Sequence, residues 1–333
     1  MKFALDAMGG DQAPYAVVQG ALDAINQSSH PLNLVLFGDE TAILKQMTGR
    51  ESDAIEIVHT DEVVSMEDQG PKVLKTKPNS SLVKGIQLVK DGKADGFISA
   101  GHTGAVMSAS LLSFGRIPGV RRPAIAAYIP TEFRGKVICD VGAYPIAKPE
   151  HLTQFAIMAS HYYDHVEGFK NPKVGLINIG EEPNKGSELY VQTYKLLSKM
   201  PNFIGNIEGR HLLTSEADVL ICDGFVGNTL LKFGESWITF FTDQIKSKIE
   251  DKIAYKIGAS LMKPIFEDLE SKFDYEEHGG VPLLGVNGIS IVCHGSSGPK
   301  SIMNSIFLAI KCIENKLIED TQKSLATHFG ENP

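Results

Sequence analysis

Residues 2–14 read KFALDAMGGDQAP, and this stretch decides the fold. Lys2 to Leu5 is a short apolar run typical of a buried strand, Asp6 to Asp11 is a turn with adjacent glycines, and Pro14 suits the first turn of a helix. The same order of strand, glycine turn and helix recurs along most of the chain. Such alternation indicates βαβ units. We therefore predict an α/β protein with a Rossmann-like, mainly parallel sheet and helices on both faces.

The predicted strands are short, and several are apolar without alternation, as strands covered on both faces should be. They are Lys2–Leu5, Asn33–Phe37, Ile55–His59, Gly96–Ser99, Ala124–Ile129, Val137–Val141, Val174–Ile179, Asp218–Cys222 and Ile289–Cys293. Between them, helix-like spacing of apolar residues predicts helices at Pro14–Asn26, Ser80–Lys90, Thr103–Phe114, Pro149–Val166, Lys185–Ser198, Asn228 onward and Pro299–Asn315.

The chain of 333 residues has no low-complexity linker. We predict a single α/β unit over residues 1–333, with the division near residue 130 if it forms two lobes. Asp6 interrupts the first apolar residues before they could form a signal peptide, and no apolar run approaches the roughly 18 residues of a spanning helix. These features predict a cytoplasmic protein.

Charge and cysteine usage exclude several classes of function. The 32 Lys and Arg residues against 40 Asp and Glu residues give a net charge of −8, which does not attract nucleic acid. The cysteines are too widely spaced for a metal or redox motif, so we predict buried, reduced side chains at Cys139, Cys222, Cys293 and Cys312. We predict no cofactor and no resident metal.

Glycine-rich turns follow several predicted strands, and they point to an anion site. Glycine permits positive φ and a close approach of ligand to backbone, while the amides of the following helix attract anions. In a parallel sheet such turns meet at one edge. The sequence contains neither G-x-G-x-x-G nor a P-loop, which favours a small anion such as phosphate over a nucleotide. The candidate phosphate-binding residues are Gly9, Gly10, Asp11, Gly101, His102, Thr103, Gly104, Gly227, Asn228, Gly295 and Ser296.

Charged residues accompany these turns. Asp6, Asp140 and Asp223 each end a predicted strand, where a carboxylate could cap the turn, orient a lysine or histidine, or hold Mg²⁺. His294 follows a strand and could donate to an oxyanion, and Lys185 stands at a predicted helix start, where a cation hints at a bound anion. No G-x-S-x-G elbow or nucleophilic cysteine motif favours covalent catalysis.

The chain closely resembles the bacterial phosphate acyltransferases, which make acyl phosphate from acyl carrier protein thioesters and orthophosphate at the start of phospholipid synthesis. The blocks that carry the resemblance run from end to end: Asp6–Asp11, Ser99–Ala105, Asp140–Gly142, Lys148–Leu152, Asn178–Glu182, Lys185–Gly186, Gly205–Gly209, Cys222–Asn228, Leu231–Lys232, Leu283–Gly285 and His294–Gly295. His102 and Tyr144 replace asparagines of the family pattern, so turn amides are safer candidates there than side chains.

The resemblance implies a homodimer with a fold like phosphotransacetylases and isopropylmalate-type dehydrogenases, and a reaction in which phosphate attacks the thioester directly. Amides and Lys185 would hold phosphate, His294 or amides would stabilise the oxyanion, and Asp223 would position Lys185 or His294. The partners implied are orthophosphate, acyl carrier protein and a downstream membrane acyltransferase. Because the carrier is acidic, docking needs local positive charge. Arg116, Arg121 and Arg122 are the first candidate, and Lys72, Lys75 and Lys77 the second.

Residues 237–275 form a helical segment predicted to make a dimer or membrane contact. Phe241, Ile245, Ile249, Ile253, Ile257 and Leu261 repeat every fourth residue, which predicts an apolar stripe on one helix flanked by lysines. The plain interpretation is a dimer interface. The sharper interpretation is a membrane-facing tip and a peripherally membrane-associated protein. Both interpretations hold if a projecting helical hairpin pairs two subunits and extends past them. The tip residues would be Ile257, Leu261, Met262 and Phe266.

Two rival functions stay open on the sequence. One is a metal-dependent hydroxyacid dehydrogenase of similar fold with Asp6, Asp140 and Asp223 as Mg²⁺ ligands, although no nicotinamide fingerprint is present. The other is a noncatalytic membrane-associated scaffold built on the segment from Trp237 to Phe266, which would not need the glycine turns.

Overall fold

A computed structural model describes residues 1–131, 134–250, 252–273 and 275–329. Its strands form one 11-stranded sheet in the order β3-β2-β1-β4-β11-β10-β5-β6-β9-β7-β8. The strands are β1 Lys2–Asp6, β2 Asn33–Gly38, β3 Ile55–His59, β4 Gly96–Ser99, β5 Ala124–Ile129, β6 Lys136–Cys139, β7 Val174–Asn178, β8 Phe203–Glu208, β9 Val219–Ile221, β10 Val281–Leu284 and β11 Ile289–Val292.

Helices cover both faces of this sheet, as the sequence predicts. They are α1 Tyr15–Gln27, α2 Glu40–Met47, α3 Val73–Thr76, α4 Ser81–Lys90, α5 Thr103–Phe114, α6 Pro149–His165, α7 Glu188–Leu197, α8 Gly224–Glu250, α9 Ile253–Phe273, α10 Pro299–Glu314 and α11 Leu317–Phe329. Alternate residues of β2 separate into two cores: Leu34 and Leu36 join the core under α1 and α10, while Val35 and Phe37 join the core under α4 and α5.

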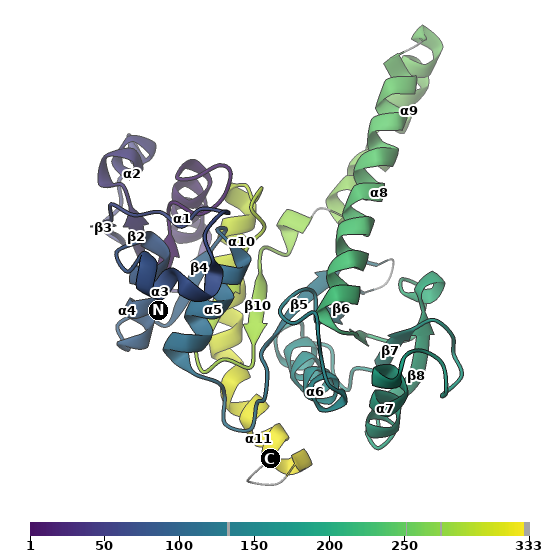
Figure 1. The fold of residues 1–333 in the computed structure, drawn as a ribbon. Helices are drawn as coiled ribbons and strands as arrows, with labels where there is room; N and C mark the ends of the chain where they lie inside the picture. Colours follow the sequence, from purple (N-terminus) through teal and green to yellow (C-terminus); the bar gives the residue numbers. More distant parts are fainter. Residues whose placement is uncertain (132–133, 251, 274, 330–333) are drawn as a thin grey trace.

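The sheet spans two lobes (Figure 1). Lobe 1 contains β3, β2, β1, β4 and β11, and lobe 2 contains β6, β9, β7 and β8. The chain passes from lobe 1 to lobe 2 along β5 and returns along β10, so the last helices pack in lobe 1 beside α1. At the far end α11 also packs against α6 of lobe 2, where the Nε2 atom of His165 lies 3.6 Å from an Asp320 carboxylate oxygen.

The sheet is mainly parallel, but its two parallel sets run in opposite directions because β10 and β5 are antiparallel to their neighbours. The prediction of one common edge is therefore wrong. The register nevertheless brings the carboxyl ends together. Val292, at the end of β11, pairs with Val281, and Cys139, at the end of β6, pairs with Ala126. Since Leu283 of β10 pairs with Ile125 of β5, both sets end near the middle of these two shared strands.

The sequence pattern did not predict two of the strands and several of the helices. Phe203–Glu208 forms β8 although Gly205 and Asn206 interrupt its apolar pattern, and Val281–Leu284 forms β10 although it contains Pro282. The prediction of an apolar stripe on a single helix is also wrong. Residues up to Glu250 belong to α8 and residues from Ile253 to α9, so the chain reverses within the stripe.

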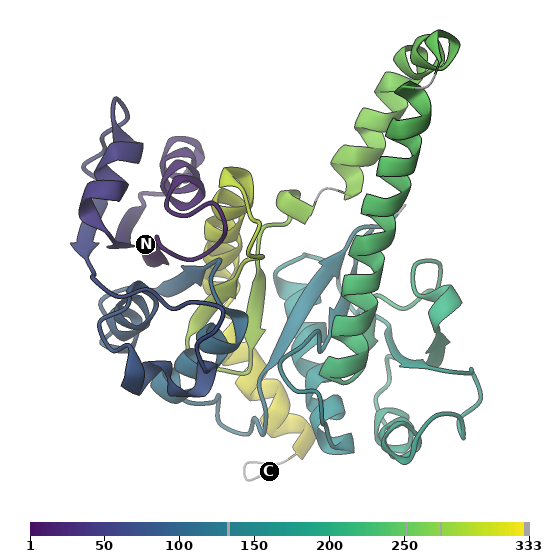
Figure 2. The ribbon, with the colours of Figure 1, turned by 45° about the horizontal axis from the view of Figure 1, so that its top comes forward.

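Helices α8 and α9 form a hairpin that projects beyond both lobes (Figures 1 and 2). The large apolar side chains of the hairpin are exposed to an unusual degree. The solvent-accessible fraction is 80% for Leu261 and 78% for Ile253. In the middle of α8, the ring of Trp237 stacks on that of Phe241, and the ring of Phe240 meets both edge to face. Among the described residues, no helix has both the length and the apolar composition needed to cross a bilayer.

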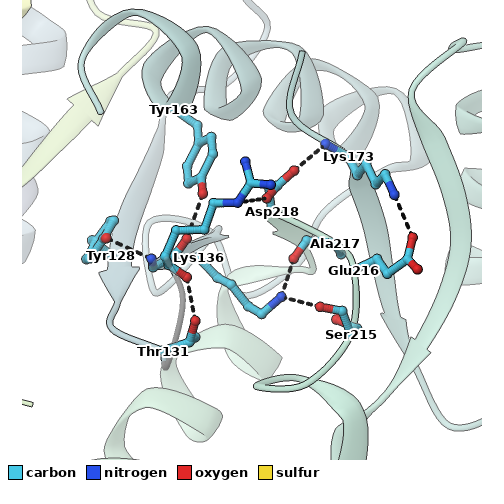
Figure 3. Close-up of polar contacts among 11 residues, drawn as sticks. Tyr128, Thr131, Lys136, Tyr163, Lys173, Ser215, Glu216, Ala217 and Asp218 are labelled. Carbon is cyan, nitrogen blue, oxygen red and sulfur yellow. Dashed lines mark hydrogen bonds and ion pairs between the residues drawn. The ribbon is translucent and has the colours of Figure 1, made fainter. Parts of the chain in front are cut away.

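A polar network anchors the amino end of β6 in lobe 2 (Figure 3). The buried ammonium of Lys136 donates to the carbonyls of Ser215 and Ala217, and the Tyr163 hydroxyl donates to the carbonyl of Gly135 at 2.7 Å. Burial lowers the pKa of Lys136. This network lies at the opposite end of β6 from the glycine turns, so it fixes the strand rather than the site.

Candidate active site

Three of the predicted turns interlock in lobe 1. The amide of Asp11 donates to the carbonyl of Gly295 at 2.7 Å, and the Gln12 side chain donates to the carbonyl of Ser296 at 3.3 Å. Gly10 has a φ of +101°, and a Cβ there would lie 3.0 Å from the Cβ of Ala100. The turns after β1, β4 and β11 therefore form one compact surface at the carboxyl end of the lobe 1 strands.

Helix α5 presents unpaired amides on this surface. In the described part of the chain, the amides of Thr103 and Gly104 have no acceptor, as expected for the first turn of a helix. The Nδ1 atom of His102 accepts from the amide of Ala105 at 3.3 Å. His102 is therefore the N-cap residue, the position that asparagine also favours, and its side chain is used inside the helix.

Helix α10 already carries an anion at its start. The amide of Gly298 donates to a Glu276 carboxylate oxygen at 2.6 Å, and the side chain of Asn304 donates to the carbonyl of Glu276 at 2.8 Å. A phosphate at this helix end would compete with that carboxylate. Gly295 and Ser296 stay part of the lobe 1 surface, with the Ser296 hydroxyl 2.7 Å from Nδ1 of His294.

The turn at Gly224–Asn228 lies in lobe 2, beside Asp140. One Asp140 carboxylate oxygen accepts from the amides of Ile125 and Ala143, each at 3.0 Å, and the other accepts from the amide of Tyr144 at 2.8 Å. Burial raises the pKa of Asp140. A Cβ on Gly227 would lie 1.9 Å from the carbonyl oxygen of Asp140. The amide of Gly227 donates within α8, so this glycine serves close packing, while Asn228 is exposed beside it.

Asp223 does not position Lys185 or His294. Its carboxylate accepts from the Tyr190 hydroxyl at 2.7 Å and from two amides of the first turn of α8, each at 3.0 Å. These bonds fix the start of α8. Lys185 lies in the turn before α7, which begins at Glu188 rather than at Lys185 as predicted, and its Nζ atom is 3.8 Å from Glu182.

The strand-end aspartates hold hydrogen bonds within the fold. Asp6 accepts from the hydroxyls of Ser81 at 2.6 Å and Ser99 at 2.8 Å, and its burial raises its pKa. Asp6 lies in lobe 1, whereas Asp140 and Asp223 lie in lobe 2. Over the ranges that the structure describes, no three His, Cys, Asp or Glu side chains are grouped to hold an ion. The predicted burial of the four cysteines is confirmed.

One contact crosses from lobe 2 to lobe 1. The Nζ atom of Lys232, on α8, lies 3.3 Å from the Nε2 atom of His294, at the end of β11. Lys232 also lies 3.2 Å from Glu235 on its own helix. The sequence alone gives Lys232 no role, because nothing in the sequence of a helix shows which lobe a lysine on it will face.

The arginine candidates border the lobe 2 turns. A guanidinium nitrogen of Arg116 donates to the carbonyl of Arg121 at 2.7 Å, so Arg116 holds the loop together. The Arg122 guanidinium lies over the ring of Tyr144, 4.7 Å from its centroid. Burial and, next, the charge of Arg122 lower the pKa of His151. Arg121 and Arg122 are thus exposed cations, and Arg122 lies beside Tyr144 in lobe 2.

Solved structures with the same architecture include a phosphotransacetylase from Streptococcus pyogenes, with a TM-score of 0.59 and 16% identity over 94% of both chains. A branched-chain phosphotransacylase from Enterococcus faecalis V583 gives a TM-score of 0.58 and 14% identity over 93% of this chain and 98% of that one. At such identities the likeness establishes the α/β fold alone.

Sequence comparison is more specific. Residues 1–320 match the family described as "Fatty acid synthesis protein". The chain is 47% identical over 328 residues to a phosphate acyltransferase of Desulfitobacterium hafniense (strain DSM 10664 / DCB-2), covering 98% of each. It is 45% identical over 328 residues to a phosphate acyltransferase of Pelotomaculum thermopropionicum, covering 98% of this chain and 95% of that one. These full-length matches show that the chain belongs to the phosphate acyltransferase family.

Proposed function

We propose that this chain forms an acyl phosphate from an acyl carrier protein thioester and orthophosphate, by direct attack of phosphate on the thioester carbonyl. Membership of the phosphate acyltransferase family supports acyl transfer with phosphate. The observation that carries the proposal is the lobe 1 surface, which presents the unpaired amides of α5 and whose His294 is contacted by a lysine from lobe 2.

The reaction needs no protein nucleophile. An oxygen of hydrogen phosphate forms the new bond to the carbonyl carbon, the carbon–sulfur bond breaks, and the phosphate proton ends on the departing thiolate. Amides of the turns after β1 and β4 and the Lys185 ammonium hold the phosphate, about 3–3.5 Å from the carbon in a reactive pose. A thiol with a pKa of about 8.5 is a good leaving group, so strong acid catalysis is unnecessary.

The test is an incubation of the protein with an acyl carrier thioester at increasing orthophosphate. We expect thiol to be released only with phosphate, and hydroxylamine to trap one acyl group for each thiol. Thiol release without phosphate, or a protein mass increased by the acyl group, would contradict direct attack. Carrier thioester and acyl pantetheine are compared as substrates, because equal kcat/KM values would remove the carrier from the proposal.

The proposal extends to partners. Arg121 and Arg122 would dock the acidic carrier beside the lobe 2 turns, where the thioester must enter. Exposed apolar residues on α8 near Trp237 and Phe241 would pair two chains as a homodimer. On α9, Ile257, Leu261 and Met262, all exposed, and the half-buried Phe266 would contact a membrane surface and deliver the poorly soluble product to a membrane acyltransferase.

A further inference from the structure

The contact between Lys232 and His294 joins elements that are distant in sequence. Lys232 lies on α8, which starts beside the lobe 2 turns, and His294 lies between β11 and α10, which belong to lobe 1. The turn that carries His294 is fixed to the Gly10 turn, since the carbonyl of Gly295 accepts from the amide of Asp11. Lys232 therefore brings a lobe 2 cation to the surface formed by the lobe 1 turns.

The chemistry of the contact fixes the direction of its hydrogen bond. A lysine ammonium has three N–H donors and no lone pair, so it can only donate. The Nε2 atom of His294, 3.3 Å away, accepts this hydrogen bond in the tautomer whose Nδ1 proton is donated to the Ser296 hydroxyl, 2.7 Å from Nδ1. In this tautomer the Ser296 amide, 3.3 Å from Nδ1, does not donate to the ring. A ring nitrogen that accepts from lysine carries no proton of its own to give to an oxyanion. The ammonium, in contrast, keeps further N–H groups for a ligand.

We infer that Lys232 is the catalytic donor to the oxyanion that forms when phosphate attacks the thioester, and that His294 is a positioning residue that holds the Lys232 ammonium at the lobe 1 turns. This assignment rests on the proposed function. It separates two lysines of lobe 2: Lys185, paired with Glu182, serves phosphate binding, and Lys232 serves the transition state.

The assignment predicts that loss of Lys232 changes kcat but not KM for phosphate. An oxyanion exists only during the reaction, so its donor affects kcat and not ground-state binding. Lys232→Met should lower kcat about 10²–10³-fold, the usual effect of losing one oxyanion donor, and leave KM for phosphate within about twofold. Lys232→Arg keeps a cation and should retain more activity. Lys246→Met, the same change on an exposed part of α8, is the matched control and should behave as wild type.

His294 provides the sharper comparison. Glutamine offers a carbonyl oxygen that can accept from Lys232, whereas phenylalanine offers none. If His294 only holds the ammonium, His294→Gln should stay within about fivefold of wild-type kcat. His294→Phe should lose as much as Lys232→Met, and the double variant Lys232→Met, His294→Phe should lose no more than either alone.

The experiment measures phosphate-dependent thiol release from an acyl carrier thioester for wild type and these variants, with thermal melting to confirm folding. A wild-type chain without this activity would contradict the proposed function itself. If wild type is active, a Lys232→Met variant within threefold of its kcat overturns only the assignment of Lys232. Equal losses in His294→Gln and His294→Phe show that the imidazole itself reacts, which overturns the positioning role.

Discussion

Gly104 and Gly227 show how one spacing serves two purposes at the scale of single residues. Both end a GxxG sequence after a strand. The amide of Gly104 is unpaired in the first turn of α5, whereas the amide of Gly227 donates to the carbonyl of Asp223 inside α8. The difference arises because α8 begins at Gly224, so its fourth residue already has an intrahelical partner. A sequence shows the spacing but not where the helix starts.

Substituting Gly227 tests its packing role. Gly227→Ala would place a Cβ 1.9 Å from the carbonyl oxygen of Asp140, and we expect a loss of about 1–3 kcal/mol in the free energy of unfolding. Gly234→Ala, on the same helix, meets nothing within 4 Å and should stabilise by about 0.5–1 kcal/mol. Urea unfolding measures both. Equal effects would show that Gly227 is not a close contact.

Asp6 gives a prediction about pH. Burial raises its pKa above the ordinary 3.8, so the folded chain binds the proton more tightly than the unfolded chain. Its contribution to stability is therefore full at low pH and is lost as the pH rises from about 4 through the folded pKa. The side chain of the Asp6→Asn variant does not titrate, so the stability of this variant relative to wild type should increase as the pH rises over this range. A stability difference that stays constant between pH 4 and 8, from urea midpoints, would contradict the shift.

At the scale of elements, the sequence predicts those whose pattern is uninterrupted. Strands such as Ile55–His59, Gly96–Ser99 and Ala124–Ile129 occur with their predicted bounds, because continuous β-branched and apolar runs leave little choice. Strand β8 was missed because Gly205 and Asn206 break its pattern, and β10 because Pro282 disfavours a strand. A projecting helical hairpin was considered, but the position of the reversal between α8 and α9 was not predicted, because apolar spacing continues through it.

The hairpin carries its own prediction, since its two helices should have separate roles. Leu261→Glu places a charge on α9 and should abolish flotation with phospholipid vesicles while the chain stays dimeric. Phe241→Glu, at the stacked rings of α8, should instead produce monomers. Leu112→Glu, at an exposed leucine on α5, is the control for both measurements. Undiminished flotation of Leu261→Glu would remove the membrane contact of α9 from the proposal, and a dimeric Phe241→Glu would remove the dimer contact of α8.

At the scale of the whole molecule, the site depends on two parallel sets of strands that run in opposite directions and end at the same level of β5 and β10. The sequence pattern predicted the turns but placed them on one edge of the sheet. It did not reveal β10 or the antiparallel pairing of β10 and β5. The return of the chain to lobe 1 also brings Gly295 to Gly10, across nearly the whole sequence. Local patterns contain no information about such pairings.

Carrier docking is a prediction at this scale. Reversing Arg121 and Arg122 to glutamate should raise KM for the acyl carrier about tenfold, with the difference shrinking in high salt as charge steering is screened. KM for phosphate should not change. The double substitution Lys72→Glu, Lys75→Glu changes the net charge by the same amount on lobe 1 and serves as the comparison. If that pair raises KM for the carrier and the arginine pair does not, the docking surface lies on lobe 1.

The most direct test of the account is a crystal structure of the protein with orthophosphate. The account predicts phosphate between the lobes, within hydrogen-bond distance of the amides of Thr103 or Gly104 and of the Lys185 ammonium, with the contact between Lys232 and His294 kept. Phosphate bound away from the turns after β1 and β4, with those amides left unpaired, would contradict it.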